Sequence, residues 1–345
     1  MRFLIVGGGA VGGIVGASLE KGGESVVIYD RNCEHVKAIN KRGLLISDIG
    51  REERVRLKAT CHLEELKGKF DVILLCVRAY STFETMKKVR PHLEDDGMVV
   101  SLQNGMGNEE LIASVVGEER TVGGVVGFSA TKISAGHITM TSSTSKLVIG
   151  RLDGKLTKSL RKLGDVLNKG IPTEVSSNIK GHLFTKLLIN SGVSSLQGLT
   201  GLAFKDLIKE KEAKPIFFRI ITEGLRIAKA LKIKPKKLYS KIDLHIFEVK
   251  ESSQSLLERE YRKLRDFLYF QLIKLFARKF SRMRSSMILE LENKRRTEIK
   301  FLNGYLVSQG KRLGVSTPIN ERVFRLIREI ENGEREMGIQ NLEEF

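Results

Sequence analysis

Three glycines near the start of the chain restrict its fold more than any other feature of the sequence. Gly7, Gly9 and Gly12 stand in G-x-G-x-x-G spacing, directly after an apolar run and before helix-compatible residues at positions 10–21. In a strand-loop-helix unit the first glycine permits a tight turn, the second lets backbone amides approach a pyrophosphate, and the third lets helix and strand pack closely. The alternative is a glycine-rich turn without a ligand. The pattern predicts a dinucleotide-binding loop that consists of Gly7, Gly9, Ala10, Val11 and Gly12.

A pair of opposite charges stands where the second strand of such a unit should end. Asp30 and Arg31 directly follow the apolar run at residues 25–29. Asp30 would accept hydrogen bonds from the 2′-hydroxyl of the adenosine ribose in NAD, whereas Arg31 would pair with the 2′-phosphate of NADP. The sequence therefore predicts NADP or NAD as the cofactor and leaves the choice open. The alternative is that both are ordinary charged residues at a strand end.

Short apolar runs alternate with helical spacing through the first half of the chain. The runs at residues 2–6, 25–29, 71–77 and 98–103 predict buried strands of a parallel sheet. Residues 43–57 predict a hairpin or loop, and residues 121–150 predict antiparallel strands that complete the sheet. Beyond Pro172 almost everything reads as helix. We therefore predict an α/β chain with a Rossmann NAD(P)-binding domain at residues 1–172 and an all-helical domain at residues 173–345.

Basic charge is concentrated in one part of the helical half. The chain has 59 Lys and Arg against 41 Asp and Glu, and +11 of its net charge of +18 lies in residues 229–300. Apolar residues recur there at steps of three and four, which predicts a basic amphipathic helical extension at about residues 241–284. Nucleic acid binding is one hypothesis for this charge. The solvated basic face of a helix is the favoured alternative, because the segment has few aromatic residues and no nucleic-acid-binding module. The apolar face of the extension instead predicts a subunit interface and a homodimer.

The cysteines, histidines and first residues exclude several classes of protein. Cysteines at positions 33, 61 and 76 form no C-x-x-C pair and leave an odd residue, so we expect neither a disulfide framework nor a structural zinc site. The six histidines show no metal-binding spacing, so no metal is expected. The apolar start at residues 1–6 is too short for a signal peptide or a membrane span. These features predict a protein of the reducing cytoplasm that has no membrane partner.

Further polar side chains stand where chemistry is expected. Asn104 follows an apolar run at the carboxyl end of a strand, where such sheets bind ligands, although an Asn-Gly pair is also a common turn signal. Lys186 and Asn190 are four residues apart on one face of a predicted helix, and Ser194 continues that face. If Lys186 is partly desolvated, its pKa falls towards neutrality and it can protonate a carbonyl oxygen as hydride arrives. The alternative is a solvated lysine whose stem covers apolar surface.

Five motifs occur in an order that marks one enzyme family. They are GGGAVGG at 7–13, QNGMGNEE at 103–110, KLLIN at 186–190, RTEIKFLNGYL at 296–306 and GVSTPINERVF at 314–324. In this order they resemble the ketopantoate reductase (2-dehydropantoate 2-reductase) family over nearly the whole chain. The resemblance implies that the helical domain is of the 6-phosphogluconate dehydrogenase C-terminal type and serves in substrate binding, catalysis and dimerisation. It also implies an active site in the cleft between the domains.

The resemblance implies roles for individual residues. Lys186 would be the general acid, and Glu298 would orient groups at the catalytic centre and contact the cofactor. The substrate-binding residues would be Asn104, Asn190, Ser194 and Ser286, with Asn104 also contacting the cofactor. The implied activity is that of an NAD(P)-dependent oxidoreductase that reduces 2-dehydropantoate to pantoate, a step in pantothenate and coenzyme A biosynthesis.

Two residues and one segment depart from the family pattern. Arg78, in VRAY, replaces the usual lysine and keeps the charge needed for cofactor contact while changing its shape. Ser194 replaces a substrate-binding asparagine, which shortens that contact and weakens the assignment of one particular 2-oxo acid. The basic extension is longer than the usual connection. A related 2-oxo acid or opine-type dehydrogenase is therefore the alternative function.

Overall fold

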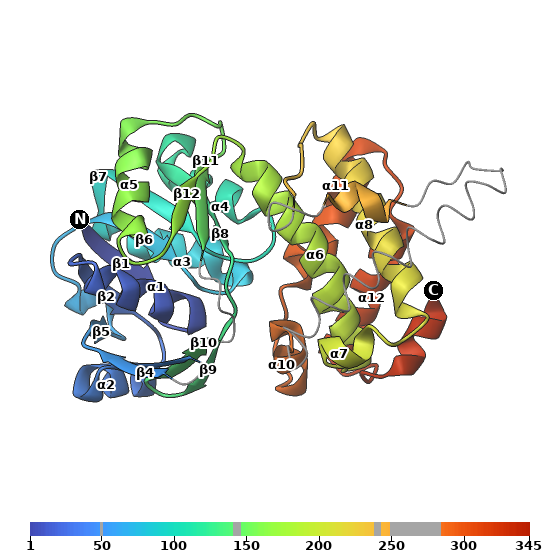
Figure 1. Cartoon of the computed structure of the whole chain (residues 1–345), viewed down its shortest axis with the longest axis horizontal. Coiled ribbons are helices and arrows are strands. Elements are labelled where there is room, and N and C mark those ends of the chain that lie inside the picture. Colours follow the sequence, from blue (N-terminus) through green and yellow to red (C-terminus); the bar gives the residue numbers. More distant parts are fainter. Residues whose placement is uncertain (49–50, 141–145, 238–242, 249–283) are drawn as a thin grey trace. The chain divides into compact units, whose positions relative to one another are not determined.

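The computed structural model describes residues 1–48, 51–140, 146–237, 243–248 and 284–345, which form two compact units, Met1–Leu183 and Phe184–Phe345. Figure 1 labels their helices and strands. Most of the basic extension predicted at about residues 241–284 lies outside the described residues. None of the described helices is both long enough and apolar enough to cross a membrane.

The first unit is built on the predicted parallel sheet. Its described strands pair in the order β12-β11-β8-β7-β6-β1-β2-β5, and the strands predicted at the four apolar runs are confirmed as β1, β2, β6 and β7. The main-sheet strands are β1 (Arg2–Val6), β2 (Ser25–Tyr29), β5 (Lys58–Thr60), β6 (Phe70–Leu75), β7 (Leu93–Ser101), β8 (Thr121–Val126), β11 (Leu147–Arg151) and β12 (Thr173–Val175).

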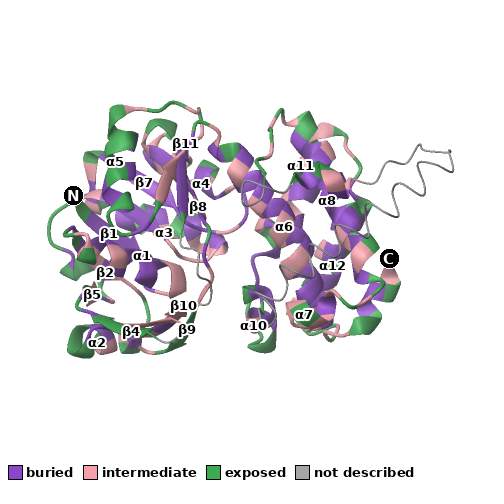
Figure 2. Ribbon diagram, in the orientation of Figure 1, coloured by how far each residue is buried: buried purple, intermediate pink, exposed green. Residues whose placement is uncertain are grey.

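Alternation of side chains along β1 supplies two hydrophobic cores. Phe3 and Ile5 join a core on one face of the sheet, and Leu4 and Val6 join a core on the other. The first face is covered by α1 (Ala10–Lys21) and α5 (Lys158–Asn168), and the second by α3 (Thr82–Val89) and α4 (Asn108–Val116). The remaining helix, α2 (Cys33–Arg42), lies beside β5. Figure 2 shows the buried strands between these layers of helices.

The prediction that residues 121–150 only complete the main sheet is wrong for its middle part. Strands β9 (Ala130–Ser134) and β10 (His137–Met140) leave that sheet and join the predicted hairpin, formed by β3 (Leu44–Asp48) and β4 (Arg51–Val55). The second sheet has the order β4-β3-β10-β9 and buries Ile138 against the core beneath α1. The reason is that apolar alternation fixes which face of a strand is buried but does not choose its partner.

A disulfide joins Cys33 and Cys61, so the expectation of no disulfide is wrong. Strands β2 and β5 are parallel neighbours, with Tyr29 opposite Thr60. The chain leaves both strands at the same edge of the sheet and brings the two cysteine Cα atoms to 5.2 Å. The two cysteines are 28 residues apart in sequence, and that spacing alone does not predict that they lie close enough to bond.

The second unit contains helices and short helical turns. The division between the two units falls between residues 183 and 184, within the long helix α6 (Ile179–Thr200). Strand β12, which precedes this helix, still belongs to the main sheet of the first unit. One helix thus serves both units, whereas the apolar pattern suggested a division near residue 172. The other described helices are α7 (Phe204–Leu207), α8 (Ala213–Ala230), α10 (Ser286–Glu292), α11 (Asn303–Leu313) and α12 (Pro318–Asn332).

Candidate active site

The predicted cofactor residues of the first unit lie at one edge of the sheet. Strands β2, β1, β6 and β7 are adjacent and parallel, so their carboxyl ends meet at that edge. The glycine loop follows β1, Asp30 follows β2, Arg78 follows β6 and Asn104 follows β7. The chain adds strands on one side of β1 and then crosses to the other side. Such a switch point is where open α/β sheets bind their ligands.

The glycine loop has the geometry of a phosphate cradle. Gly7, with φ of 99°, donates its N–H to Tyr29 O at 2.8 Å and turns the chain sharply after β1. A Cβ on Gly12 would lie 2.0 Å from Gly7 O, so only glycine fits there. A Cβ on Gly9 would meet nothing within 4 Å, which leaves space before the first turn of α1. The first amides of that helix, including those of Ala10 and Val11, have no partner within the helix and favour an anion. These residues fit the pyrophosphate of a dinucleotide.

Asp30 and Arg31 have different surroundings. Asp30 Oδ2 accepts the Gly8 N–H at 2.7 Å, and Oδ1 accepts the Asn32 N–H at 2.8 Å. Arg31 is exposed. Asp30 therefore holds the glycine loop in place, while Arg31 lies at the surface.

A buried polar network that the sequence did not predict connects the loops of Arg78 and Asn104. Gln103 Nε2 donates to Val77 O at 2.9 Å and to Thr82 Oγ1 at 2.8 Å. Thr82 Oγ1 lies 3.1 Å from Asn108 Oδ1, and Asn108 Nδ2 donates to Asn104 O at 3.1 Å. Gln103 and Asn108 belong to the QNGMGNEE motif. The motif therefore located this part of the site, but it did not show that these two side chains hold the loops of Arg78 and Asn104 together.

Lys186 and Glu298 are brought together in the second unit. Lys186 lies on α6, and burial lowers its pKa to about 8, while the charge of Glu298 acts in the opposite direction. The lowered pKa agrees with the value expected for a lysine that donates a proton near neutral pH. Asn190 and Ser194 continue the same helix face and are partly buried.

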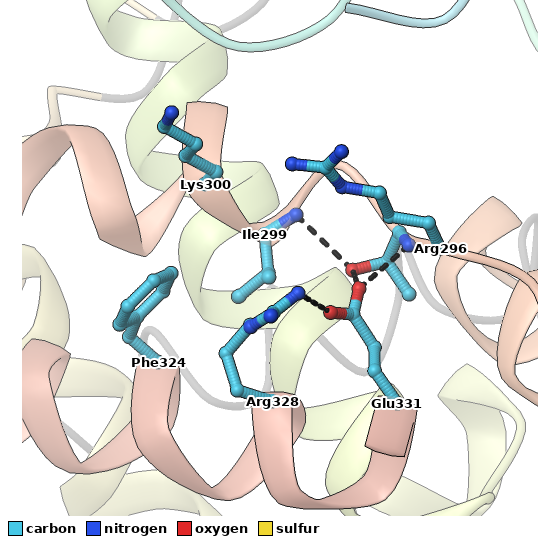
Figure 3. A pocket seen from close by; sticks show the side chains of 7 residues that line it. Arg296, Ile299, Lys300, Phe324, Arg328 and Glu331 are labelled. Atoms are coloured by element: carbon cyan, nitrogen blue, oxygen red, sulfur yellow. Dashed lines mark hydrogen bonds and ion pairs between the residues drawn. The ribbon is translucent and has the colours of Figure 1, made fainter. Parts of the chain in front are cut away.

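The backbone beside Glu298 is anchored by Glu331. The carboxylate of Glu331 accepts the Thr297 N–H at 2.6 Å and the Thr297 hydroxyl at 2.5 Å, and it pairs with Arg328 at 2.6 Å. Figure 3 shows these contacts at the edge of a pocket of about 250 Å³. The pocket is lined by Arg296, Thr297, Ile299, Lys300, Phe324, Arg328 and Glu331. Both sequence neighbours of Glu298 line this pocket, so the anchor fixes the segment from which Glu298 projects.

Ser286 stands beside the end of α6 that carries Ser194. The preceding residue, Ser285, caps α10 by accepting the Ile288 N–H. Ser285 also donates its N–H to Gln197 Oε1 at 3.1 Å and its hydroxyl to Ser194 O at 3.5 Å. Ser286 begins α10 and is exposed. Two of the predicted substrate residues therefore lie on adjoining segments.

A second buried network joins four helices and was also missed by the sequence. Asn303 donates to Ser191 O at 3.2 Å and to Asn320 Oδ1 at 2.9 Å, and it accepts the Ser195 hydroxyl at 2.6 Å. Glu223 in turn accepts the backbone N–H of Asn320 at 2.9 Å and its side-chain amide at 2.7 Å. Asn303 and Asn320 lie in the two late motifs of the chain, FLNGY and TPIN. Residues of these two motifs therefore join α6, α8, α11 and α12 through buried hydrogen bonds.

Comparisons with known proteins agree over nearly the whole chain. Residues 3–154 match the family described as "Ketopantoate reductase PanE/ApbA", and residues 178–331 match its C-terminal domain. A 2-dehydropantoate 2-reductase of Aquifex aeolicus is 29% identical over 331 residues, which cover 95% of this chain and 96% of the relative.

Solved structures give the same result. The crystal structure of a PanE/ApbA family ketopantoate reductase from Ralstonia eutropha JMP134 matches with a TM-score of 0.79 and 26% identity, covering 97% of this chain and 100% of that one. A D-mandelate dehydrogenase in complex with NADH and anilino(oxo)acetate shares the fold, with a TM-score of 0.80 and 23% identity over 96% of this chain and 99% of that one. The chain belongs to the ketopantoate reductase family.

Proposed function

We propose that this protein is an NADPH-dependent 2-dehydropantoate 2-reductase, which converts 2-dehydropantoate to pantoate. The observation that carries the proposal is the environment of Lys186. Its pKa is lowered to about 8, and Glu298, from another segment, lies near it. The same face of α6 also carries Asn190 and Ser194. An ammonium of lowered pKa, flanked by amide and hydroxyl groups, suits the reduction of a polar ketone.

The first unit would hold the cofactor. The loop of Gly7, Gly9 and Gly12 would bind the pyrophosphate, and Arg78 and Asn104 would contact the nicotinamide half. The exposed Arg31 supports NADPH over NADH because its guanidinium can pair with the 2′-phosphate of NADPH. The reduced nicotinamide, when bound, supplies the hydride.

Residues of the second unit would bind the substrate and deliver the proton. Lys186 in its charged form donates a hydrogen bond to the ketone oxygen and then its proton, as negative charge develops on that oxygen. Glu298 stabilises the charged form of Lys186. Asn190, Ser194 and Ser286 supply amide and hydroxyl groups that suit the carboxylate and the hydroxyl of 2-dehydropantoate.

A second candidate function is the reduction of another 2-oxo acid. The D-mandelate dehydrogenase of the same fold was solved with anilino(oxo)acetate, and Ser194 departs from the family pattern at a substrate position. Initial rates with 2-dehydropantoate, pyruvate, 2-oxoisovalerate, 2-oxoglutarate and benzoylformate separate the candidates. The highest kcat/KM with 2-dehydropantoate supports the proposal, and a preference for any other acid refutes the assigned substrate.

We also propose that the enzyme is a homodimer. The apolar positions in the sequence of the basic segment, at about residues 241–284, support a subunit interface. Light scattering of the full chain and of a variant without residues 252–282 tests it. The proposal requires a dimeric mass that the deletion lowers.

A further inference from the structure

Two of the three cysteines are bonded beside the adenosine end of the proposed cofactor site. Cys33 is the first residue of α2, three positions after Asp30, and Cys61 directly follows β5. Both residues are partly exposed. Burial raises the pKa of the third thiol, Cys76, to about 12, which keeps it protonated and unreactive.

The segment around Cys33 holds the glycine loop from both sides. His35 Nδ1 accepts the Gly136 N–H at 2.9 Å, so the ring proton is on Nε2, which donates to Gly8 O at 2.8 Å. Asp30 accepts the Gly8 N–H at 2.7 Å. Both backbone groups of Gly8 are therefore held by residues that lie two or three positions from Cys33. A shift of this segment would move the loop that cradles the pyrophosphate.

The segment around Cys61 is joined to the segment around Cys33 by hydrogen bonds as well as by the disulfide. Thr60 O accepts the Asp30 N–H at 3.1 Å, and Thr60 Oγ1 accepts the His62 N–H at 3.0 Å. The disulfide therefore adds a covalent link between two segments that also share a backbone hydrogen bond. A ring nitrogen of the exposed His62 lies with both sulfurs in a group whose atoms are all within 4.8 Å of one another. This places an imidazole nitrogen beside the two sulfurs.

We propose that Cys33 and Cys61 form a reversible two-electron redox site that sets the affinity of the glycine loop for the dinucleotide cofactor. This inference rests on the proposed function. Formation of the bond consumes a low-molecular-weight disulfide: one cysteine thiolate attacks it and expels a thiolate, and the second cysteine displaces the other half. The protein loses two electrons and two protons, and two small thiols form. A dithiol reductant restores the thiols: one of its thiolates opens the protein disulfide, its second thiol closes a cyclic disulfide, and the protein regains two electrons and two protons.

The disulfide holds the loop in its binding conformation, and reduction lets the loop leave it. In a reducing compartment the pair would then respond to the local ratio of thiol to disulfide. If the reduced loop is in its binding conformation about one tenth of the time, the apparent Kd for NADPH is about tenfold higher.

The experiment equilibrates the full chain in buffers of defined dithiol-to-disulfide ratio. Thiols are counted after denaturation, and the Kd for NADPH is measured by calorimetry on the same samples. The reduced protein should show three thiols and the oxidised protein one. The Kd should rise about tenfold as the thiol count rises, with kcat at saturating NADPH within about twofold. An equal Kd in both states, or three thiols under oxidising conditions, overturns the inference.

Four variants sharpen the test. Cys33→Ser and Cys61→Ser should each show the weaker affinity regardless of the dithiol, and Cys76→Ser should keep the response. His62→Ala should keep both affinities but slow thiol exchange. Redox-dependent NADPH binding without turnover of 2-dehydropantoate would uphold this inference and refute the proposed function. Turnover with the same Kd in both redox states would do the reverse.

Discussion

The ionisation of Lys186 sets the pH dependence expected of catalysis. Its pKa of about 8 means that the ammonium, the form that donates a proton, dominates below that pH and is lost above it. We expect kcat/KM for 2-dehydropantoate to be level on the acid side and to fall about tenfold per pH unit above about pH 8, because kcat/KM reports the ionisation of the enzyme before this substrate binds. A pH profile of kcat/KM for 2-dehydropantoate at saturating NADPH measures this. A rate that stays level to pH 10 would contradict the role of Lys186.

Glu298 should act on that profile through its charge. Its carboxylate raises the pKa of Lys186 against the effect of burial, so Glu298→Gln should move the descending limb to lower pH. The control is Glu343→Gln, because Glu343 is an exposed carboxylate near the C-terminus. A profile that does not move, or that moves to higher pH, would mean that Glu298 does not support the charged lysine.

Arg31 should determine the choice between the two nicotinamide cofactors. Removal of a guanidinium that pairs with the 2′-phosphate should raise KM for NADPH about tenfold or more and leave KM for NADH nearly unchanged. The variant is Arg31→Ala, and the matched control is Arg42→Ala, an exposed arginine at the end of α2. Equal effects on the two cofactors would refute this role of Arg31.

At the scale of elements, the junction of β1 and α1 allows stability to be separated from cofactor binding. A methyl group on Gly12 meets Gly7 O at 2.0 Å, whereas one on Gly9 meets open space. Gly12→Ala should therefore lower the urea midpoint of unfolding, and Gly9→Ala should leave it unchanged while weakening NADPH binding. Chemical denaturation and calorimetry of both variants check this. Gly9→Ala with unaltered NADPH affinity would show that phosphate does not occupy this space.

The network around Asn303 should account for the positions of the helices in the second unit. Asn303→Ala leaves the buried Ser195 hydroxyl without its acceptor and Asn320 Oδ1 without its donor, so we expect a loss of about 2 kcal/mol or more in the free energy of unfolding. Urea denaturation measures the loss, with Asn332→Ala at an exposed position of α12 as the control. Equal effects of the two substitutions would mean that the network contributes little.

At the scale of the whole molecule, local patterns were predictable and distant pairings were not. The apolar runs located β1, β2, β6 and β7, and the spacing of Lys186 and Asn190 on one helix suggested a proton donor whose lowered pKa the structure supports. The second sheet pairs β10 with β3, which is far away in sequence. The Cys33–Cys61 bond depends in the same way on which strands become neighbours. Periodicity reports which faces are buried, and pairing depends on the assembled fold.

The buried polar networks show the same limit. Gln103, Asn108, Asn303 and Asn320 all stand in motifs that the sequence singled out, yet their roles depend on partners from other elements. An amide in a motif is compatible with ligand contact, a turn or an internal hydrogen bond. Only the fold distinguishes these roles for these four residues, and it assigns them to bracing the loops and helices.

The most direct test of the account is NADPH oxidation with 2-dehydropantoate by the wild type, Lys186→Ala and Lys180→Ala. Lys180 is an exposed lysine of the same helix and serves as the control. Circular dichroism establishes that all three proteins are equally folded. We predict turnover by the wild type and by Lys180→Ala, and a loss of about 10²-fold or more in Lys186→Ala. A wild type that binds NADPH but does not reduce 2-dehydropantoate, or a Lys186→Ala variant with near-normal kcat, would contradict the account.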